Sequence, residues 1–218
     1  MTPGEAVTLR IKKQNSACHV HGSVSMIDNL LLGNHRFRES DFTPNIDHYR
    51  DLVDAQHPKV LWLGCSDSRV NPERITESRA GEIFVQRNIG NIVPDHDWNF
   101  ATVLEFAIVH LKVEEIVICG HSDCGAIKAL DMVSTDAYIP LWLSNARVAK
   151  ERVDAVIKKA ETAEELKARQ RAIEQENVKL QLEHLLTYPL VKNAVDGGKL
   201  QVHGLYYDLE TGVLSRIC

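Results

Sequence analysis

Residues 59–69, Lys-Val-Leu-Trp-Leu-Gly-Cys-Ser-Asp-Ser-Arg, join a continuously apolar run to a short polar segment that begins with a cysteine. The apolar part, residues 59–64, predicts a strand covered on both faces, because a half-exposed strand would alternate apolar and polar residues. The same arrangement recurs at 115–125, where Glu-Ile-Val-Ile-Cys-Gly precedes His-Ser-Asp-Cys-Gly. The two stretches predict two buried strands that each end in residue types suited to metal binding or catalysis.

Further strands are predicted at 82–87, 200–207 and 213–217, and helices at 25–39 and 100–111. Residues 140–190 are charged and helical, and Leu166, Ile173 and Leu180 repeat there every seven residues. That repeat fits a seam for a partner helix or a stripe that faces the protein's own core. The alternation of strands and helices predicts an α/β fold: a central, mostly parallel sheet flanked by helices on both faces, with an N-terminal helical arm. We expect residues 1–24 to be a tail and 25–218 to form one domain.

The composition excludes several classes of protein. The 218 residues are 44% hydrophobic and 25% charged, with a net charge of −5 and no basic stripe for nucleic acid. No apolar run approaches membrane-spanning length, and the N-terminus lacks the apolar region of a secretory signal. Five scattered cysteines suit reduced thiols or metal ligands better than a disulfide framework. These features predict a cytoplasmic protein that binds neither nucleic acid nor membrane.

Cys65, His121 and Cys124 are the candidate metal ligands. They follow two predicted parallel strands at their carboxyl ends, the edge of an α/β sheet where ligands bind. Two thiolates and an imidazole suit zinc, and three protein ligands leave a fourth position open for catalysis. The alternative is two core thiols and a loop histidine, which is the better interpretation of each residue alone but not of the paired motifs. We therefore predict one Zn²⁺ per chain.

Asp67 and Arg69 stand two residues apart directly after Cys65, so their side chains can form a bidentate ion pair. Asp67 could accept a hydrogen bond from zinc-bound water and orient it for attack. It could instead leave Arg69 and bind the metal, which would close the site. An ordinary surface ion pair of small energetic value is the alternative.

The ordered set Cys-x-Asp-x-Arg and His-x-x-Cys resembles the signature of β-class carbonic anhydrases. The resemblance runs from about Leu30 to Tyr207 and includes the segments 33–37, 55–58, 65–70, 81–89 and 120–125. It implies reversible hydration of carbon dioxide to bicarbonate and a proton by zinc-bound hydroxide, with Asp67 and Arg69 as the catalytic pair. It also implies a homodimer or homotetramer with its sites at the dimer interface.

Other site residues follow from the same resemblance. Gln56 would donate a hydrogen bond to a substrate oxygen, and Phe84 and Ile89 would line an apolar pocket for carbon dioxide, although both also fit a plain core. Trp62, Arg87 and Tyr207 match the noncatalytic bicarbonate pocket of the regulated, type II subgroup. An arginine fork and aromatic N–H and O–H donors would suit an anion. Such regulation would place Asp67 on zinc at lower pH; the alternative is that these three residues only pack or form an ion pair.

Three other functions remain open on the sequence. A carbonyl sulfide or carbon disulfide hydrolase would share every motif. A non-catalytic zinc protein would not need Asp67, Arg69 and Gln56. A redox protein could join Cys65 to Cys124, but thioredoxin-like spacing is absent.

Overall fold

The computed structural model describes residues 25–157 and 160–218 and divides at Tyr49 into two compact units, Met1–Tyr49 and Arg50–Cys218. The first unit contains α1 (Met26–Phe37), the π-helical turn η1 (Arg38–Phe42) and the start of α2 (Ile46–Asp54). Helix α1 begins with a capping box, in which the Ser25 side chain accepts from the Asp28 N–H and the Asp28 carboxylate accepts from the Ser25 N–H. The helix predicted at 25–39 is confirmed. The predicted tail, 1–24, lies outside the described residues, and the domain boundary at residue 25 stays a prediction.

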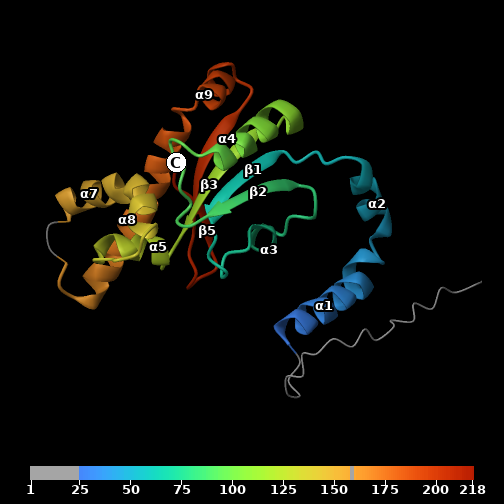
Figure 1. The fold of residues 1–218 in the computed structure, drawn as a ribbon, viewed down its shortest axis with the longest axis horizontal. Coiled ribbons are helices and arrows are strands. Elements are labelled where there is room, and N and C mark those ends of the chain that lie inside the picture. Colours follow the sequence, from blue (N-terminus) through green and yellow to red (C-terminus); the bar gives the residue numbers. More distant parts are fainter. Residues whose placement is uncertain (1–24, 158–159) are drawn as a thin grey trace, which may run out of the picture. The chain divides into compact units, whose positions relative to one another are not determined.

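The second unit is built on a five-stranded sheet in the order β2-β1-β3-β4-β5 (Figure 1). Its strands are β1 (Val60–Cys65), β2 (Ile83–Asn88), β3 (Glu115–His121), β4 (Gln201–Tyr207) and β5 (Leu214–Arg216). The first four pair in parallel, and β5 pairs antiparallel with β4. This confirms the predicted α/β class and places all five predicted strands. The carboxyl ends of β1 and β3, where the two motifs begin, are therefore neighbours.

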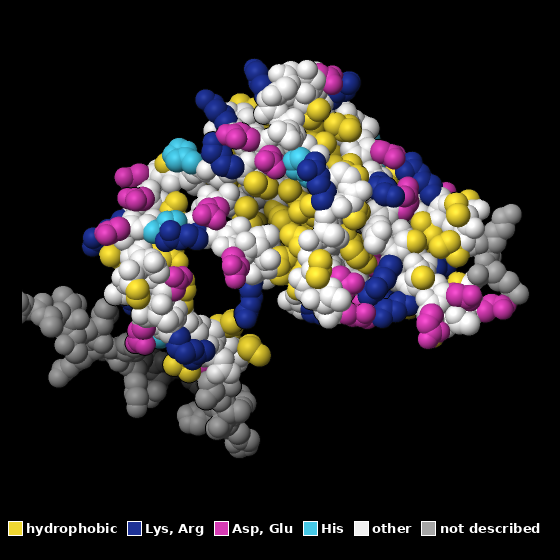
Figure 2. All heavy atoms as spheres, turned by 180° about the vertical axis from the view of Figure 1, so that it is seen from behind, with side chains coloured by type: hydrophobic (Ala, Val, Ile, Leu, Met, Phe, Trp, Pro, Cys, Tyr) yellow, Lys and Arg dark blue, Asp and Glu magenta, His cyan; other side chains and the backbone are white. Residues whose placement is uncertain are grey.

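The two faces of the sheet are covered differently. On one face Leu61, Leu63, Ile116 and Ile118 belong to the main core, together with residues of α4, α8 and α9. On the other face Trp62, Val117 and Cys119 form a smaller cluster. Ile75 of α3 and half-buried side chains of β2, β4 and β5 pack against that cluster. Figure 2 shows hydrophobic side chains gathered near the centre of the face seen from behind, with charged side chains around them.

The remaining helices of this unit are short except for one of 23 residues. Their bounds are α3 (Pro72–Thr76), α4 (Trp98–Glu105), η2 (Phe106–Leu111), α5 (Gly125–Lys128), η3 (Ala129–Asp131), α6 (Ile139–Leu143), η4 (Ser144–Ala146), α7 (Arg147–Val156), α8 (Ala163–Leu185) and α9 (Pro189–Asp196). The helix predicted at 100–111 is thus α4 with a π-helical continuation. Ile173 and Leu180 of the seven-residue repeat are buried, whereas Leu166 is half exposed, so most of the repeat faces the core.

None of the helices between residues 25 and 157 or between 160 and 218 is long and apolar enough to cross a membrane.

Candidate metal centre

The three predicted ligands meet at the carboxyl edge of the sheet. Cys65 is the last residue of β1, His121 is the last of β3, and Cys124 caps the start of α5. Their ligand atoms all lie within 4.8 Å of one another, and all three residues are buried. Asp123 turns the chain between the last two ligands in the left-handed conformation, with φ of 61°, which Asp tolerates better than most residues.

The His121 ring is oriented for metal binding. Its Nδ1 lies 2.9 Å from the Ser122 carbonyl oxygen, to which it donates when protonated. That bond leaves the lone pair on Nε2, which is buried and has no hydrogen-bond partner among the described residues. A buried nitrogen with no partner is costly unless something else binds it. The Cys2His donor set and this unpartnered Nε2 together fit a zinc ion.

The pKa values of the two ligand thiols are shifted in opposite directions. The pKa of Cys65 is lowered, mainly because the Cys124 thiol donates a hydrogen bond to it, with His121 and the Gly90 N–H adding to this effect. The pKa of Cys124 is raised because the Cys65 thiolate lies beside it and because it is buried. Burial lowers the pKa of His121, but the neighbouring Cys65 and Asp67 outweigh burial and raise it. A bound cation would favour two thiolates and a neutral imidazole.

Glu174 is a supporting residue that the sequence did not reveal. It comes from α8 and is almost fully buried. Its Oε1 accepts from the Cys124 N–H at 2.9 Å and from Gln170 Nε2 at 3.0 Å, and its Oε2 accepts from the Tyr206 hydroxyl at 2.6 Å. Burial raises the pKa of Glu174 although these donors oppose the rise. A glutamate in a helix rich in charged residues carries no sequence signal for this role.

Asp67 and Arg69 form the predicted bidentate pair beside the three ligands. Arg69 donates from Nε to Asp67 Oδ1 at 2.9 Å and from Nη2 to Oδ2 at 2.7 Å. This pair holds the pKa of Asp67 well below its usual range. Asp67 Oδ2 also lies 3.8 Å from His121 Nε2, so the carboxylate borders the space where a metal would bind.

The other predicted site residues are divided between the two ends of β1. Ile89 directly follows β2 at the ligand end, next to Gly90, whose N–H lies 3.4 Å from Cys65 Sγ. Phe84 pairs in register with Leu61 near the amino end of β1, and exposed Gln56 precedes that strand. Leu61, the register partner of Phe84, is four residues from Cys65, or about 13 Å at roughly 3.3 Å per residue, and Gln56 lies farther along the chain, before the strand begins. Within one chain the structure therefore does not bring Gln56 or Phe84 to the ligands.

Trp62, Arg87 and Tyr207 lie on one face of the sheet. Residues that are in register on neighbouring strands, or two apart on one strand, share a face of the sheet. Gly64, two residues after Trp62, is in register with Arg87 on β2 and with Cys119 on β3. Two residues after Cys119, His121 is in register with Tyr207. The indole N–H of Trp62 is buried and finds no acceptor in residues 25–157 or 160–218. Arg87 donates to three carbonyl oxygens at the end of β1 and in the loop after it, those of Cys65 at 2.8 Å, Asp67 at 2.6 Å and Val70 at 2.7 Å.

Comparisons with known proteins agree with this geometry. A family model described as carbonic anhydrase matches residues 60–214. A carbonic anhydrase of Synechococcus elongatus is 36% identical over 195 residues, which cover 86% of this chain and 70% of the relative. The structure of the β-carbonic anhydrase CcaA superposes with a TM-score of 0.81 at 34% identity and covers 88% of this chain and 95% of that one. A tetrameric β-carbonic anhydrase from Sordaria macrospora gives a TM-score of 0.81 at 31% identity, with 88% and 96% covered. The chain therefore belongs to the β-carbonic anhydrase family.

Proposed function

We propose that this protein catalyses the reversible hydration of carbon dioxide to bicarbonate and a proton, with one Zn²⁺ per chain held by Cys65, His121 and Cys124. The observation that carries the proposal is the buried Cys2His group, with an unpartnered Nε2, beside an intact Asp67–Arg69 pair. Zinc held there would acidify water enough to supply hydroxide near neutral pH.

Asp67 acts in this proposal as a fixed hydrogen-bond acceptor. Because its pKa is held low by Arg69, it is ionised throughout the working pH range and can accept but not donate. A hydroxyl group bound near His121 Nε2 would have to direct its proton at Asp67, which leaves its lone pair free for attack on carbon dioxide. If Asp67 released Arg69, it could itself become a fourth metal ligand, and the site would then be closed.

A second copy of the chain would complete the site. Gln56 and Phe84 lie at the amino end of β1, too far from their own Cys65 to act there. We infer a homodimer, or a homotetramer built from dimers, in which Gln56 and Phe84 of one chain and Ile89 of the other line the pocket for carbon dioxide.

Bicarbonate would regulate the enzyme through Trp62, Arg87 and Tyr207, as in the type II subgroup. The guanidinium of Arg87 now holds the carbonyl groups of the loop that carries Asp67. An anion bound by Arg87 and the free Trp62 N–H would compete for those donors and loosen the loop. Bicarbonate binding and closure by Asp67 would therefore be coupled, and both would be favoured at lower pH.

The test is metal analysis combined with a stopped-flow assay of carbon dioxide hydration. One zinc per chain and hydration that is lost in Cys65→Ser support the proposal, and the lack of both would refute it. Parallel assays with carbonyl sulfide and carbon disulfide identify the substrate. Inhibition by bicarbonate that disappears in Trp62→Phe would support the regulatory pocket, and inhibition that persists unchanged would exclude it. We place the protein in the cytoplasm, without a nucleic-acid or membrane partner, and cell fractionation tests this location.

A further inference from the structure

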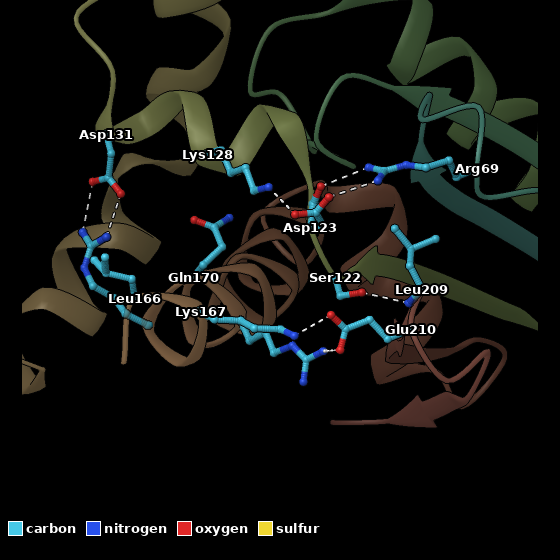
Figure 3. Close-up of a pocket in the computed structure, with 12 residues that line it drawn as sticks. Arg69, Ser122, Asp123, Lys128, Asp131, Leu166, Lys167, Gln170, Leu209 and Glu210 are labelled. Carbon is cyan, nitrogen blue, oxygen red and sulfur yellow. Dashed lines mark hydrogen bonds and ion pairs between the residues drawn. The ribbon is translucent and has the colours of Figure 1, made fainter. Parts of the chain in front are cut away.

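The guanidinium of Arg69 is bound by two carboxylates that come from two different loops. Besides its two bonds to Asp67, it donates from Nη1 to Asp123 Oδ2 at 3.0 Å and from Nη2 to the Asp123 carbonyl oxygen at 3.0 Å. One carboxylate, that of Asp67, lies in the loop after β1, and the other, that of Asp123, lies in the loop after β3. Figure 3 shows Arg69 reaching across to Asp123.

Asp123 is itself fixed in place. It lies between the ligands His121 and Cys124, so its backbone position is set by the metal loop. Its second oxygen, Oδ1, accepts a hydrogen bond from Lys128 of α5. Arg69 and Lys128 thus hold one oxygen each of the Asp123 carboxylate.

Arg69 would have room to move without this contact. Its side chain is 47% exposed and borders a cavity of about 510 Å³. Other carboxylates line that cavity, but Asp131 is engaged by Arg169 at 2.6 Å, and Glu210 by Lys167 and Arg171 at 2.5 and 2.8 Å. A long arginine side chain that is not already bound by Asp123 would lose more conformational entropy when it pairs with Asp67.

We propose that Asp123 is a positioning residue for the Asp67–Arg69 pair, holding Arg69 in the orientation in which its fork meets Asp67. The inference rests on the proposed role of Asp67 and Arg69 in hydration. It links the loop that carries two metal ligands to the loop that carries the acceptor carboxylate. Asp123 acts through Arg69 and does not touch the reacting atoms.

The test compares Asp123→Asn with a matched control, Asp131→Asn. Asparagine tolerates the left-handed backbone and keeps one oxygen, but its amide nitrogen cannot accept from the second cation. Asp131 lines the same cavity and pairs with Arg169, away from Arg69. We expect Asp123→Asn to lower kcat about two- to fivefold, the range of a partly exposed ion pair, with KM, zinc content and melting temperature unchanged. Asp131→Asn should leave kcat, KM and zinc content unchanged.

A second readout does not depend on activity. Phenylglyoxal modifies accessible arginines, and peptide mass spectrometry measures the rate at Arg69 against that at Arg152, which two other carboxylates hold. Asp123→Asn should raise the rate at Arg69 about two- to fivefold on the same energetic grounds, whereas Asp131→Asn should not. An unchanged rate at Arg69 would overturn the inference.

A double-mutant cycle separates positioning from a merely structural role. If Asp123 acts through the pair, adding Asp123→Asn to Asp67→Asn should change kcat little further, whereas independent effects would multiply. A multiplied loss, or zinc lost in Asp123→Asn alone, overturns the inference and assigns Asp123 to the metal loop. If Asp67→Asn leaves kcat unchanged, the proposed role of the pair fails as well. If Asp67→Asn lowers kcat and Asp123→Asn does not, only the present inference fails.

Discussion

Replacing Glu174 by alanine should damage both stability and metal affinity, although Glu174 lies outside every sequence motif. Its carboxylate is the acceptor for three donors, the Cys124 N–H, the Tyr206 hydroxyl and Gln170 Nε2. Two of these donors, on Cys124 and Tyr206, are buried. The half-buried Gln170 can turn to water, but the other two donors would be left without an acceptor.

The cost follows from those two donors. Each buried donor left unsatisfied costs about 1–3 kcal/mol, so the pair costs about 2–6 kcal/mol. Removing a carboxylate whose charge is itself penalised by burial offsets part of this, and we expect a loss of about 2–4 kcal/mol in the free energy of unfolding. Because the Cys124 backbone loses its anchor, zinc affinity should also fall by roughly tenfold, the lower end of the range for lost support of metal ligands.

Urea unfolding at fixed free zinc measures the stability, and competition with a chromophoric chelator measures the affinity. Glu176→Ala is the matched control, because Glu176 lies on the same helix and pairs with the exposed side chains of Arg152 and Lys179, at a cost of about 1 kcal/mol or less. Glu174→Gln keeps an acceptor for Cys124 and should fall between the two. Equal unfolding free energies for Glu174→Ala and Glu176→Ala would refute the reasoning.

Three further predictions concern single residues. Because Arg69 lowers the pKa of Asp67 below the usual 3.8, the Asp67–Arg69 pair stabilises the fold above pH 3.8. The melting temperatures of metal-free wild type and Asp67→Asn should therefore converge as the pH falls below 3.8, and a constant difference between them would contradict this. Burial raises the pKa of Cys119 to about 12, so iodoacetamide should label it far more slowly than exposed Cys218 in the native protein, and equal labelling by mass spectrometry would be inconsistent with its burial. A Cβ on Gly120 would lie 2.6 Å from Val178 Cγ2, so Gly120→Ala should lower the free energy of unfolding by about 1–3 kcal/mol. Thermal unfolding followed by circular dichroism measures this, and an unchanged melting temperature would count against that close approach.

The strands were predictable from sequence because each is a short apolar run with clear ends. Predicted and observed strand boundaries differ by at most one residue, and Cys65 and His121 stand where the two apolar runs stop. Both facts depend on local sequence alone, since the end of a buried parallel strand is where side chains become polar. The helical region 140–190 was harder, because its charged residues continue through the break between α7 and α8, and the capping box of Thr162 and Glu165 is the local signal that restarts the helix.

The supporting contacts could not be predicted, because they join residues distant in sequence. Glu174 meets Cys124 from 50 residues away, and Arg69 meets Asp123 from 54. Asp123 has no role that its sequence position suggests, since a polar residue between two ligands also suits an ordinary turn. Its function depends on where β1 and β3 place their two loops, which only the sheet order defines.

The division of site residues along β1 gives the strongest argument for assembly. The carboxyl end of β1 carries Cys65 and, in the loop after it, Asp67, with Ile89 close by; Phe84 lies beside the amino end of β1, and Gln56 precedes that end. If Gln56 and Phe84 act in the site, as we propose, each chain holds two incomplete parts of it about one strand length apart. A two-fold axis between two copies would bring the ligand end of each chain against the Gln56 end of the other and complete both sites at once.

The predicted pocket therefore requires pairing of two chains, and Gln56→Ala should inactivate a site whose metal ligands belong to its partner. Mixing Gln56→Ala chains with Cys65→Ser chains, each inactive alone, should restore about a quarter of the wild-type activity per site for random pairing into symmetric dimers. Recovery of no activity at all would show that Gln56 serves its own chain or none.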